Sequence, residues 1–225
     1  MTSVNDIRPT IAPVRLATAL SGLDIEGFFG ADGAPASIAD AELTLRGVTV
    51  SSDDCESEWL FVAVPGLKQH GIRFAHAAIE AGASVVLTDE EGRTQAHERG
   101  LGVPVIQVAD PRGVVAQLCA NVYTSPATRL TTMAITGTNG KTTTSYLMRA
   151  AIASRFPHAS LCGTVETHVG PISFEAVRTT AEAPVIARFL AATEQYECGA
   201  GVIELSAHAL SLHRVDGIVF DVAAF

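Results

Sequence analysis

The sequence predicts an α/β protein built from two parallel-sheet domains, and three observations lead to this prediction. Short apolar runs alternate with helix-like stretches from residue 60 onward, as successive βαβ units do. A glycine-rich loop stands between an apolar run and a helical stretch at residues 136–143. Hydrophobic residues make up 48% of the 225 residues and charged residues only 17%, which indicates extensive buried sheet.

The first half of the chain is expected to form a small α/β domain over residues 1–126. Its expected strands span 60–64, 84–88 and 103–108, and its expected helices span 74–81 and 112–122. The first 40 residues show no pattern that predicts an element. The polar, proline-containing segment 123–129 interrupts the alternation, so we place the domain boundary there.

The second domain is expected to cover residues 127–225. We expect strands at 130–136, 159–163, 172–177, 201–205 and 217–225, and helices at 142–153 and 183–194. The last strand has the apolar character of buried sheet, and nothing follows that would cover its faces. We therefore expect a truncated domain, of which the chain carries only the first part.

Composition excludes several classes of protein. The net charge of −9 argues against a nucleic-acid partner, since binding phosphate backbones needs a surplus of lysine and arginine. No apolar run reaches the about 18 residues of a membrane span, and the start of the chain lacks the pattern of a secretion signal. We expect a cytoplasmic protein without a membrane partner. The four cysteines are widely scattered, which predicts reduced, buried thiols.

The segment TGTNGKTT, residues 136–143, is the strongest motif. Its glycines allow a tight turn that presents backbone N–H groups to a phosphate, and the following helix adds its positive end. Lys141 can then reach the terminal phosphates, while Thr142 can place its hydroxyl on Mg²⁺. Ile135 stands where the common pattern GxxxxGK(S/T) has glycine. The alternative is a strand-to-helix turn with an incidental lysine.

TGTNGKTT resembles the phosphate loop of the Mur ligases and of folylpolyglutamate synthases, which form an amide bond after phosphorylating a carboxylate with ATP. The resemblance implies two cofactors, ATP and Mg²⁺, and a triphosphate bound by Gly137, Thr138, Asn139, Gly140, Lys141, Thr142 and Thr143.

The segment ELSAHAL, residues 204–210, resembles the ExSSH segment of the Mur ligases, although Ala207 replaces its second serine. By this likeness Thr142, Glu204 and His208 would hold metal, and Lys141, Glu204 and His208 would be the catalytic groups. Taken alone, Glu204 would be a solvated residue at the end of a strand, and His208 a structural residue at a helix terminus.

Between residues 48 and 89 the segments VTVSSDD, LFVAVPGLKQHGIRF and AAIEAGASVVLTD resemble the uridine-nucleotide domain of MurE-type Mur ligases. Folylpolyglutamate synthases lack this domain before their loop. Ser52 aligns with the serine of the DSR motif, which contacts the uridine diphosphate portion, and residues 67–71 align with a second nucleotide loop. Ser51 and Asp53 replace the aspartate and arginine of that motif, which reverses a charge. The alternative is a plain polar turn.

Four further residues match contacts to the peptide part of the MurE substrate. Thr179 and Thr180 resemble the TTPE segment, although such a pair also suits a helix-capping turn. Ser206 and Arg214 match the other contacts, and an arginine pairs well with a carboxylate.

The resemblance covers residues 45–225 and implies an ATP-dependent ligase that adds an amino acid, the third residue, to the UDP-MurNAc dipeptide UDP-MurNAc-L-Ala-D-Glu. The carboxy-terminal domain and the metal-binding carbamate lysine of such ligases have no counterpart here, so we expect no ligase activity from these 225 residues alone. Two alternatives are a truncated paralogue that binds the uridine nucleotide without catalysis, and a ligase of the folylpolyglutamate-synthase kind.

Overall fold

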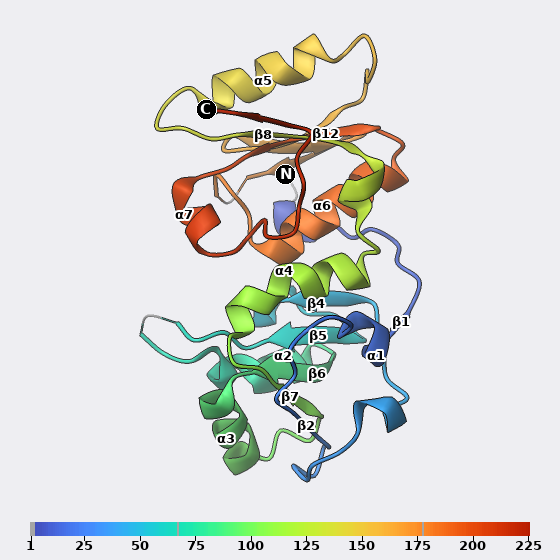
Figure 1. Ribbon diagram of the computed structural model, residues 1–225, viewed down its shortest axis with the longest axis vertical. Coiled ribbons are helices and arrows are strands. Elements are labelled where there is room, and N and C mark those ends of the chain that lie inside the picture. Colours follow the sequence, from blue (N-terminus) through green and yellow to red (C-terminus); the bar gives the residue numbers. More distant parts are fainter. Residues whose placement is uncertain (1–2, 67, 177) are drawn as a thin grey trace. The chain divides into compact units, whose positions relative to one another are not determined.

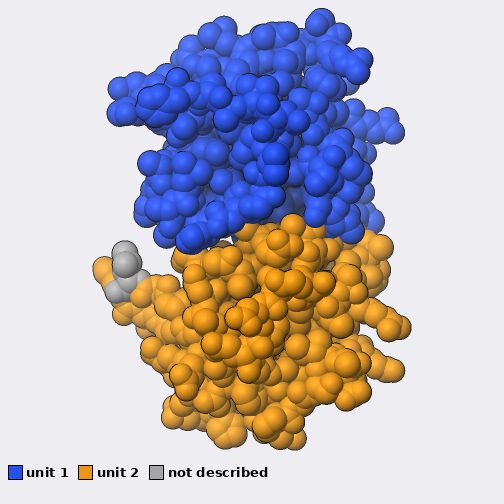
Figure 2. All heavy atoms as spheres, in the orientation of Figure 1, with its two compact units in different colours: residues 1–10, 123–225 blue, residues 11–122 orange. Residues whose placement is uncertain are grey.

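The computed structural model describes residues 3–66, 68–176 and 178–225, and it divides into two compact units (Figure 1, Figure 2). One unit contains residues 11–122, and the other combines the first ten residues with residues 123–225. The α/β class with parallel sheets is confirmed. The division lies four residues before the expected boundary, and the first ten residues differ from the expectation because they belong with the second half of the chain.

The unit of residues 11–122 has a five-stranded sheet in the order β2-β7-β6-β5-β4, in which only β2 is antiparallel to its neighbour. Its strands are β2 Gly27–Phe29, β4 Gly47–Thr49, β5 Trp59–Val62, β6 Ala83–Thr88 and β7 Val105–Gln107. A separate two-stranded sheet joins β1 Val14–Arg15 to β3 Thr44–Leu45. The helices are α1 Leu16–Ala19, α2 Ala75–Glu80, α3 Glu90–Arg99 and α4 Pro111–Val122, and the short 3₁₀ turns are η2 Ile38–Asp40, η3 Ser52–Asp54 and η4 Gly71–Phe74.

Helix α3 is absent from the elements expected from the sequence, and its composition explains why. The helix reads EEGRTQAHER, so it has no apolar periodicity, and only Gly92 and Ala96 are buried. It is instead defined by its ends. The Asp89 carboxylate accepts a hydrogen bond from the Gly92 N–H at 2.8 Å, and Gly100 ends the helix in the left-handed region at a φ of 59°.

The other unit has a six-stranded sheet in the order β11-β10-β9-β12-β8-β13. Strands β9, β12, β8 and β13 are parallel, while β10 runs antiparallel to both of its neighbours. The strands are β8 Thr131–Ile135, β9 Ser160–Cys162, β10 Glu166–Val169, β11 Ile172–Glu175, β12 Ala200–Glu204 and β13 Val222–Ala224. The helices are α5 Lys141–Ala151, α6 Ala183–Gln195 and α7 Ala207–Ser211, with 3₁₀ turns at η1 Val4–Asp6 and η5 Pro126–Arg129.

Successive residues of β8, β9 and β12 pack on opposite faces of the sheet. Met133, Leu161 and Val202 pack with residues of α5, whereas the next residue of each strand packs in the larger core beneath α6, namely Ala134, Cys162 and Ile203. Helices α5 and α6 therefore cover the two faces of one sheet, as Figure 1 shows. Among the described residues, no helix combines the length and the apolar character that crossing a bilayer requires.

The strand expected at 217–225 is present, but it is shorter and more exposed than expected. Only Val222–Ala224 forms a strand, β13, which pairs with β8 at the edge of the sheet. Val219 and Phe225 are 85% and 98% exposed. Gly217 turns the chain at a φ of 76°, and Asp221 then joins the sheet by accepting a hydrogen bond from the Thr132 N–H at 2.7 Å. The expected strand at 172–177 is the shorter β11, and Val177 lies outside the described residues.

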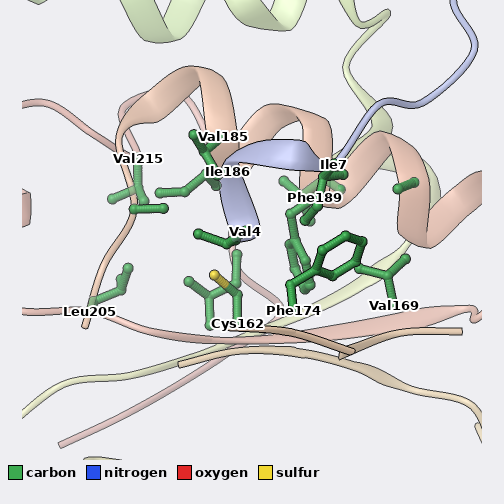
Figure 3. Packing of buried hydrophobic residues seen from close by; sticks show 14 of the residues in the cluster. Val4, Ile7, Cys162, Val169, Phe174, Val185, Ile186, Phe189, Leu205 and Val215 are labelled. Carbon is green, nitrogen blue, oxygen red and sulfur yellow. The ribbon is translucent and has the colours of Figure 1, made fainter. Parts of the chain in front are cut away.

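The amino-terminal segment completes the core beneath α6. Val4 and Ile7 are 3% and 2% exposed and pack among side chains of α6 and the sheet, as Figure 3 shows. Ser3 and Asp6 form a capping box that closes η1. The buried Arg188 of α6 donates a hydrogen bond to the Asn5 carbonyl at 3.3 Å. The segment is thus part of the second unit, not an appendage.

Replacing Ile7 with alanine is expected to lower the free energy of unfolding by about 2–4 kcal/mol, because the change leaves a cavity in this core. Urea denaturation followed by circular dichroism measures the loss. Val219→Ala is the control, because this residue is 85% exposed and its change is expected to stay within about 0.5 kcal/mol. Equal losses for the two variants would contradict the assignment of Ile7 to the core.

Candidate functional site

The phosphate loop connects the end of β8 to the start of α5. Gly137 and Gly140 have φ angles of 130° and 83°, which residues with a side chain rarely adopt. Lys141 begins α5, and its ammonium group donates a hydrogen bond to the Gly137 carbonyl at 2.7 Å. Ile135 is the last residue of β8 and only 3% exposed, so the position where the common pattern has glycine is here filled by a core side chain.

Glu204 lies at the end of β12, next to this loop, and is fully buried. Three hydroxyl groups donate hydrogen bonds to its carboxylate. Thr142 and Thr164 donate to Oε2 at 3.1 and 2.7 Å, and Ser145 donates to Oε1 at 2.9 Å. The structure therefore brings the predicted residues Thr142 and Glu204 into contact, and it adds two residues that the sequence analysis missed.

Gly163 and Thr164 reach Glu204 because β9 lies beside β12 in the parallel sheet, so both strands end at the same edge. A Cβ atom on Gly163 would lie 2.4 Å from Glu204 Oε1, so only glycine leaves room for the carboxylate. The pair Gly-Thr directly after the strand at 160–162 was the sequence pattern that could have indicated this position.

Thr180 connects Glu204 to the segment that follows it. The Thr180 hydroxyl donates a hydrogen bond to the Glu204 carbonyl at 2.9 Å and accepts one from the Ser206 N–H at 2.9 Å. Ser206 in turn caps α7, because its Oγ accepts a hydrogen bond from the Ala209 N–H at 3.1 Å. Thr179 is the half-buried neighbour of Thr180.

Arg214 is also part of this network. It is 7% exposed and donates to the Thr180 carbonyl at 2.8 Å and to Glu182 Oε1 at 2.7 Å. Arg178 donates to the same carboxylate oxygen of Glu182 at 2.6 Å. Thr180, Ser206 and Arg214, three of the four residues predicted to contact the peptide, therefore lie in one hydrogen-bonded cluster.

Of the three predicted metal residues, Thr142 and Glu204 are joined by a hydrogen bond. His208 is exposed on α7, whereas Glu204 is fully buried. Within the described ranges, no group of three or more His, Cys, Asp or Glu side chains could hold a metal ion. The oxygen atoms around Glu204 nevertheless suit Mg²⁺, which prefers hard oxygen ligands and keeps several positions for phosphate and water. The donor set at Thr142 and Glu204 therefore fits Mg²⁺ chemically, and the metal roles of Thr142, Glu204 and His208 stay predictions.

A second polar cluster ties α5 to β10 just beyond Thr164. The Tyr146 hydroxyl donates to Glu166 Oε1, and His168 Nε2 lies 2.8 Å from the same oxygen. Burial and the hydrogen bond to Glu166 raise the pKa of Tyr146 to about 12. The Tyr146 hydroxyl, with His168 as a smaller cause, lowers the pKa of Glu166. This cluster holds the strand that carries the Gly163–Thr164 turn.

Ser52 lies in the other unit, on the 3₁₀ turn η3. Its hydroxyl donates to the neighbouring Asp53 carboxylate at 3.3 Å, and the Thr49 hydroxyl donates to Asp54 at 3.1 Å. The SSDD segment is thus an ordered acidic turn. Leu67, the first residue of the predicted second nucleotide loop, lies outside the described residues.

Because the pKa of Glu166 is lowered in the folded state, its ionised form stabilises the fold at neutral pH. That contribution is present above the unfolded pKa of 4.5 and is lost as the pH falls through the lower folded pKa. We expect Glu166→Gln to be less stable than the parent chain at pH 7, with the difference shrinking below pH 4.5. Urea unfolding at pH 7 and pH 3.5 tests this, and a pH-independent difference would refute it.

Two family models match the chain. The model described as Mur ligase family, catalytic domain, matches residues 44–123, and the model described as Mur ligase middle domain matches residues 135–225. Each of the two units therefore carries a match, and the second match begins at the last residue of β8.

The UDP-N-acetylmuramoyl-L-alanyl-D-glutamate--2,6-diaminopimelate ligase of Streptomyces avermitilis is 40% identical over 196 residues, which are 87% of this chain and 38% of the relative. The UDP-N-acetylmuramyl-tripeptide synthetase of Leifsonia xyli is 39% identical over 217 residues, which are 96% of this chain and 40% of the relative. The chain thus spans about two fifths of the length of these relatives.

Comparison with solved structures shows that the similarity extends to the fold. A UDP-N-acetylmuramoyl-L-alanyl-D-glutamate--2,6-diaminopimelate ligase superposes with a TM-score of 0.68 at 22% identity, covering 94% of this chain and 40% of its own. A MurF structure from Acinetobacter baumannii superposes with a TM-score of 0.54 at 17% identity and covers 88% of this chain and 37% of its own. With both units matched in sequence and fold, the chain belongs to the Mur ligase family, of which it carries amino-terminal and middle-domain sequence.

Proposed function

We propose that this chain supplies the nucleotide-binding and substrate-binding part of an ATP-dependent ligase that adds the third amino acid to UDP-MurNAc-L-Ala-D-Glu. One observation carries the proposal. The phosphate loop, the buried Glu204 and the Thr180–Ser206–Arg214 cluster meet at one edge of one sheet. The named relatives are a 2,6-diaminopimelate ligase and a tripeptide synthetase, and both names describe a reaction of the proposed type.

The proposed reaction has two steps. An oxygen of the terminal glutamate carboxylate attacks the γ-phosphorus of ATP, so that an acyl phosphate forms and ADP leaves. The amine of the incoming amino acid then attacks the acyl carbon, loses a proton and expels phosphate, which leaves an amide bond. Both steps depend on alignment and charge neutralisation, which the protein supplies.

Residues 137–143 are proposed to bind the triphosphate. The loop presents backbone N–H groups, and the amino-terminal end of α5 adds a partial positive charge. The Lys141 ammonium now contacts loop carbonyls and lies where it can move to the phosphate oxygens. Mg²⁺, held with the help of Thr142 and Glu204, would neutralise phosphate charge when bound. His208 is proposed as a ligand of a second metal.

The peptide and nucleotide portions of the substrate are assigned to different residues. Thr179, Thr180, Ser206 and Arg214 are proposed for the dipeptide. Arg178 and Arg214 share the single carboxylate of Glu182, so this cluster has a net positive charge for a substrate carboxylate. Ser52 is proposed for the uridine diphosphate portion. The turn that carries Ser52 also carries Asp53, whose charge opposes a diphosphate, so we expect a weaker affinity than an arginine there would give.

Lys141→Ala is expected to weaken ATP binding about 10- to 100-fold, because it removes a charge-assisted hydrogen bond to phosphate. Calorimetric titration of the 225-residue chain with ATP and excess Mg²⁺ measures the change. Arg155→Ala, which also removes one exposed positive charge from the same unit, is the control and should leave the affinity unchanged. Unaltered binding by Lys141→Ala would exclude this loop as the phosphate site.

Calorimetric titration with UDP-MurNAc-L-Ala-D-Glu tests the substrate. We expect saturable binding, and we expect Ser52→Ala to weaken it about 3- to 10-fold through the loss of one hydrogen bond. Ser57→Ala, a change at an exposed serine of the same unit, serves as the control. A chain that circular dichroism shows to be folded but that binds no precursor would contradict the proposed substrate.

A further inference from the structure

Three polar side chains form a row on the hairpin of β10 and β11, and none of them takes part in the proposed ligase reaction. Glu166 and His168 lie on one face of β10, because side chains two positions apart on a strand share a face. The pairing of the two strands places Ser173 of β11 directly opposite His168. The other face of the hairpin is turned to the core beneath α6, where Val169 and Phe174 are buried.

The hydrogen bonds of this row run in one direction. His168 Nε2 lies 2.8 Å from Glu166 Oε1, and because an ionised carboxylate can only accept, Nε2 must carry the proton. In the neutral imidazole, Nδ1 then keeps its lone pair. Ser173 Oγ lies 2.9 Å from Nδ1, so the serine hydroxyl donates to it. A serine hydroxyl, an imidazole base and a carboxylate thus follow one another in a chain.

The carboxylate at the end of this chain is kept ionised. The Tyr146 hydroxyl donates to Glu166 Oε1, and this hydrogen bond, with the one from His168 as a smaller cause, lowers the pKa of Glu166. Burial and the contact with Glu166 raise the pKa of Tyr146 to about 12, so the phenol keeps its proton and remains a donor. Glu166 is therefore a charged acceptor that holds His168 in one tautomer.

The serine is the accessible end of the chain. Ser173 is exposed, whereas the side chains of His168 and Glu166 retain 24% and 30% of their surface. A hydroxyl whose proton can pass to an adjacent base is a better nucleophile than a free alcohol. A reagent in solvent can thus reach an activated Ser173 Oγ directly.

We propose that Ser173 is a covalent modification site for small, uncharged activated acyl compounds such as esters and thioesters, with His168 as its general base. Ser173 Oγ attacks the carbonyl carbon of the acyl compound, and the hydroxyl proton passes to His168 Nδ1. The bond from that carbon to the leaving oxygen or sulfur breaks, and the leaving group takes the proton from Nδ1. An O-acylserine remains. Glu166 and Tyr146 are positioning residues.

The charge on this face of the hairpin selects the acyl compound. Glu175 is the cross-strand partner of Glu166 and is exposed, so two carboxylates lie on the same face as Ser173. They repel an anionic donor such as an acyl phosphate and leave an uncharged ester unaffected.

The test is acetylation of the folded 225-residue chain by p-nitrophenyl acetate, quenched with acid and mapped by peptide mass spectrometry. We expect Ser173 to be acetylated about 100-fold faster than Ser154, an exposed serine of the same unit. His168→Gln is expected to remove this advantage, because glutamine cannot act as a base. His158→Gln, at another exposed histidine of the unit, is the control and should leave both rates unchanged. With acetyl phosphate, the advantage of Ser173 over Ser154 should be smaller.

Nuclear magnetic resonance of ¹⁵N-labelled imidazole groups gives a second readout that needs no variant. Above neutral pH we expect His168 to carry its proton on Nε2 and none on Nδ1. Equal acetylation of Ser173 and Ser154 by the ester, an unchanged Ser173 rate in His168→Gln, or a His168 ring protonated at Nδ1 alone would each overturn the inference. A larger advantage of Ser173 with acetyl phosphate than with the ester would overturn the choice of uncharged donors.

Discussion

The carboxylate of Glu204 is the group on which the phosphate-binding unit depends most. A charged side chain without exposed surface is costly unless hydrogen bonds replace the lost water. Here three hydroxyl donors do so, and they come from the start of α5 and from the turn after β9. The need to satisfy one buried carboxylate therefore fixes the helix that carries Lys141 and the turn that carries Thr164 at the same edge of the sheet.

The backbone of the same residue extends this constraint to the cluster of Thr180, Ser206 and Arg214, which is proposed to bind the peptide. The Glu204 carbonyl accepts the hydroxyl proton of Thr180, whose own carbonyl accepts a hydrogen bond from Arg214. One residue thus joins the proposed phosphate site through its side chain to the proposed peptide site through its main chain. Phosphoryl transfer between two bound substrates needs such fixed placement, because misalignment of the reacting oxygen and phosphorus strongly lowers the reaction rate.

Much of this unit could be predicted from the sequence, because its elements are strongly patterned. The apolar run before TGTNGKTT and the run ending in Glu204 are long enough to be recognised as parallel strands, and they are β8 and β12. Thr164 and Ser145 were missed for a different reason. Thr164 meets Glu204 because β9 lies beside β12, and Ser145 meets it because α5 packs against β12. No local pattern reports which elements become neighbours. Helix α3 was missed because it has no apolar face. The length and burial of the strand expected at 217–225 were overestimated because exposed residues there are apolar.

The amino-terminal segment shows the same limit over a longer distance. Val4 and Ile7 are two apolar residues in a polar stretch, so only the tertiary structure reveals that they belong to the core beneath α6. Residues 11–122 separate this segment from the rest of its unit, and closing a flexible loop of that length costs about 4 kcal/mol. Burial of the two side chains contributes about 3–6 kcal/mol, which is of the same size. The segment is therefore held only when Val4 and Ile7 are buried together. Prior folding of residues 11–122 shortens the effective loop and so favours attachment of the segment.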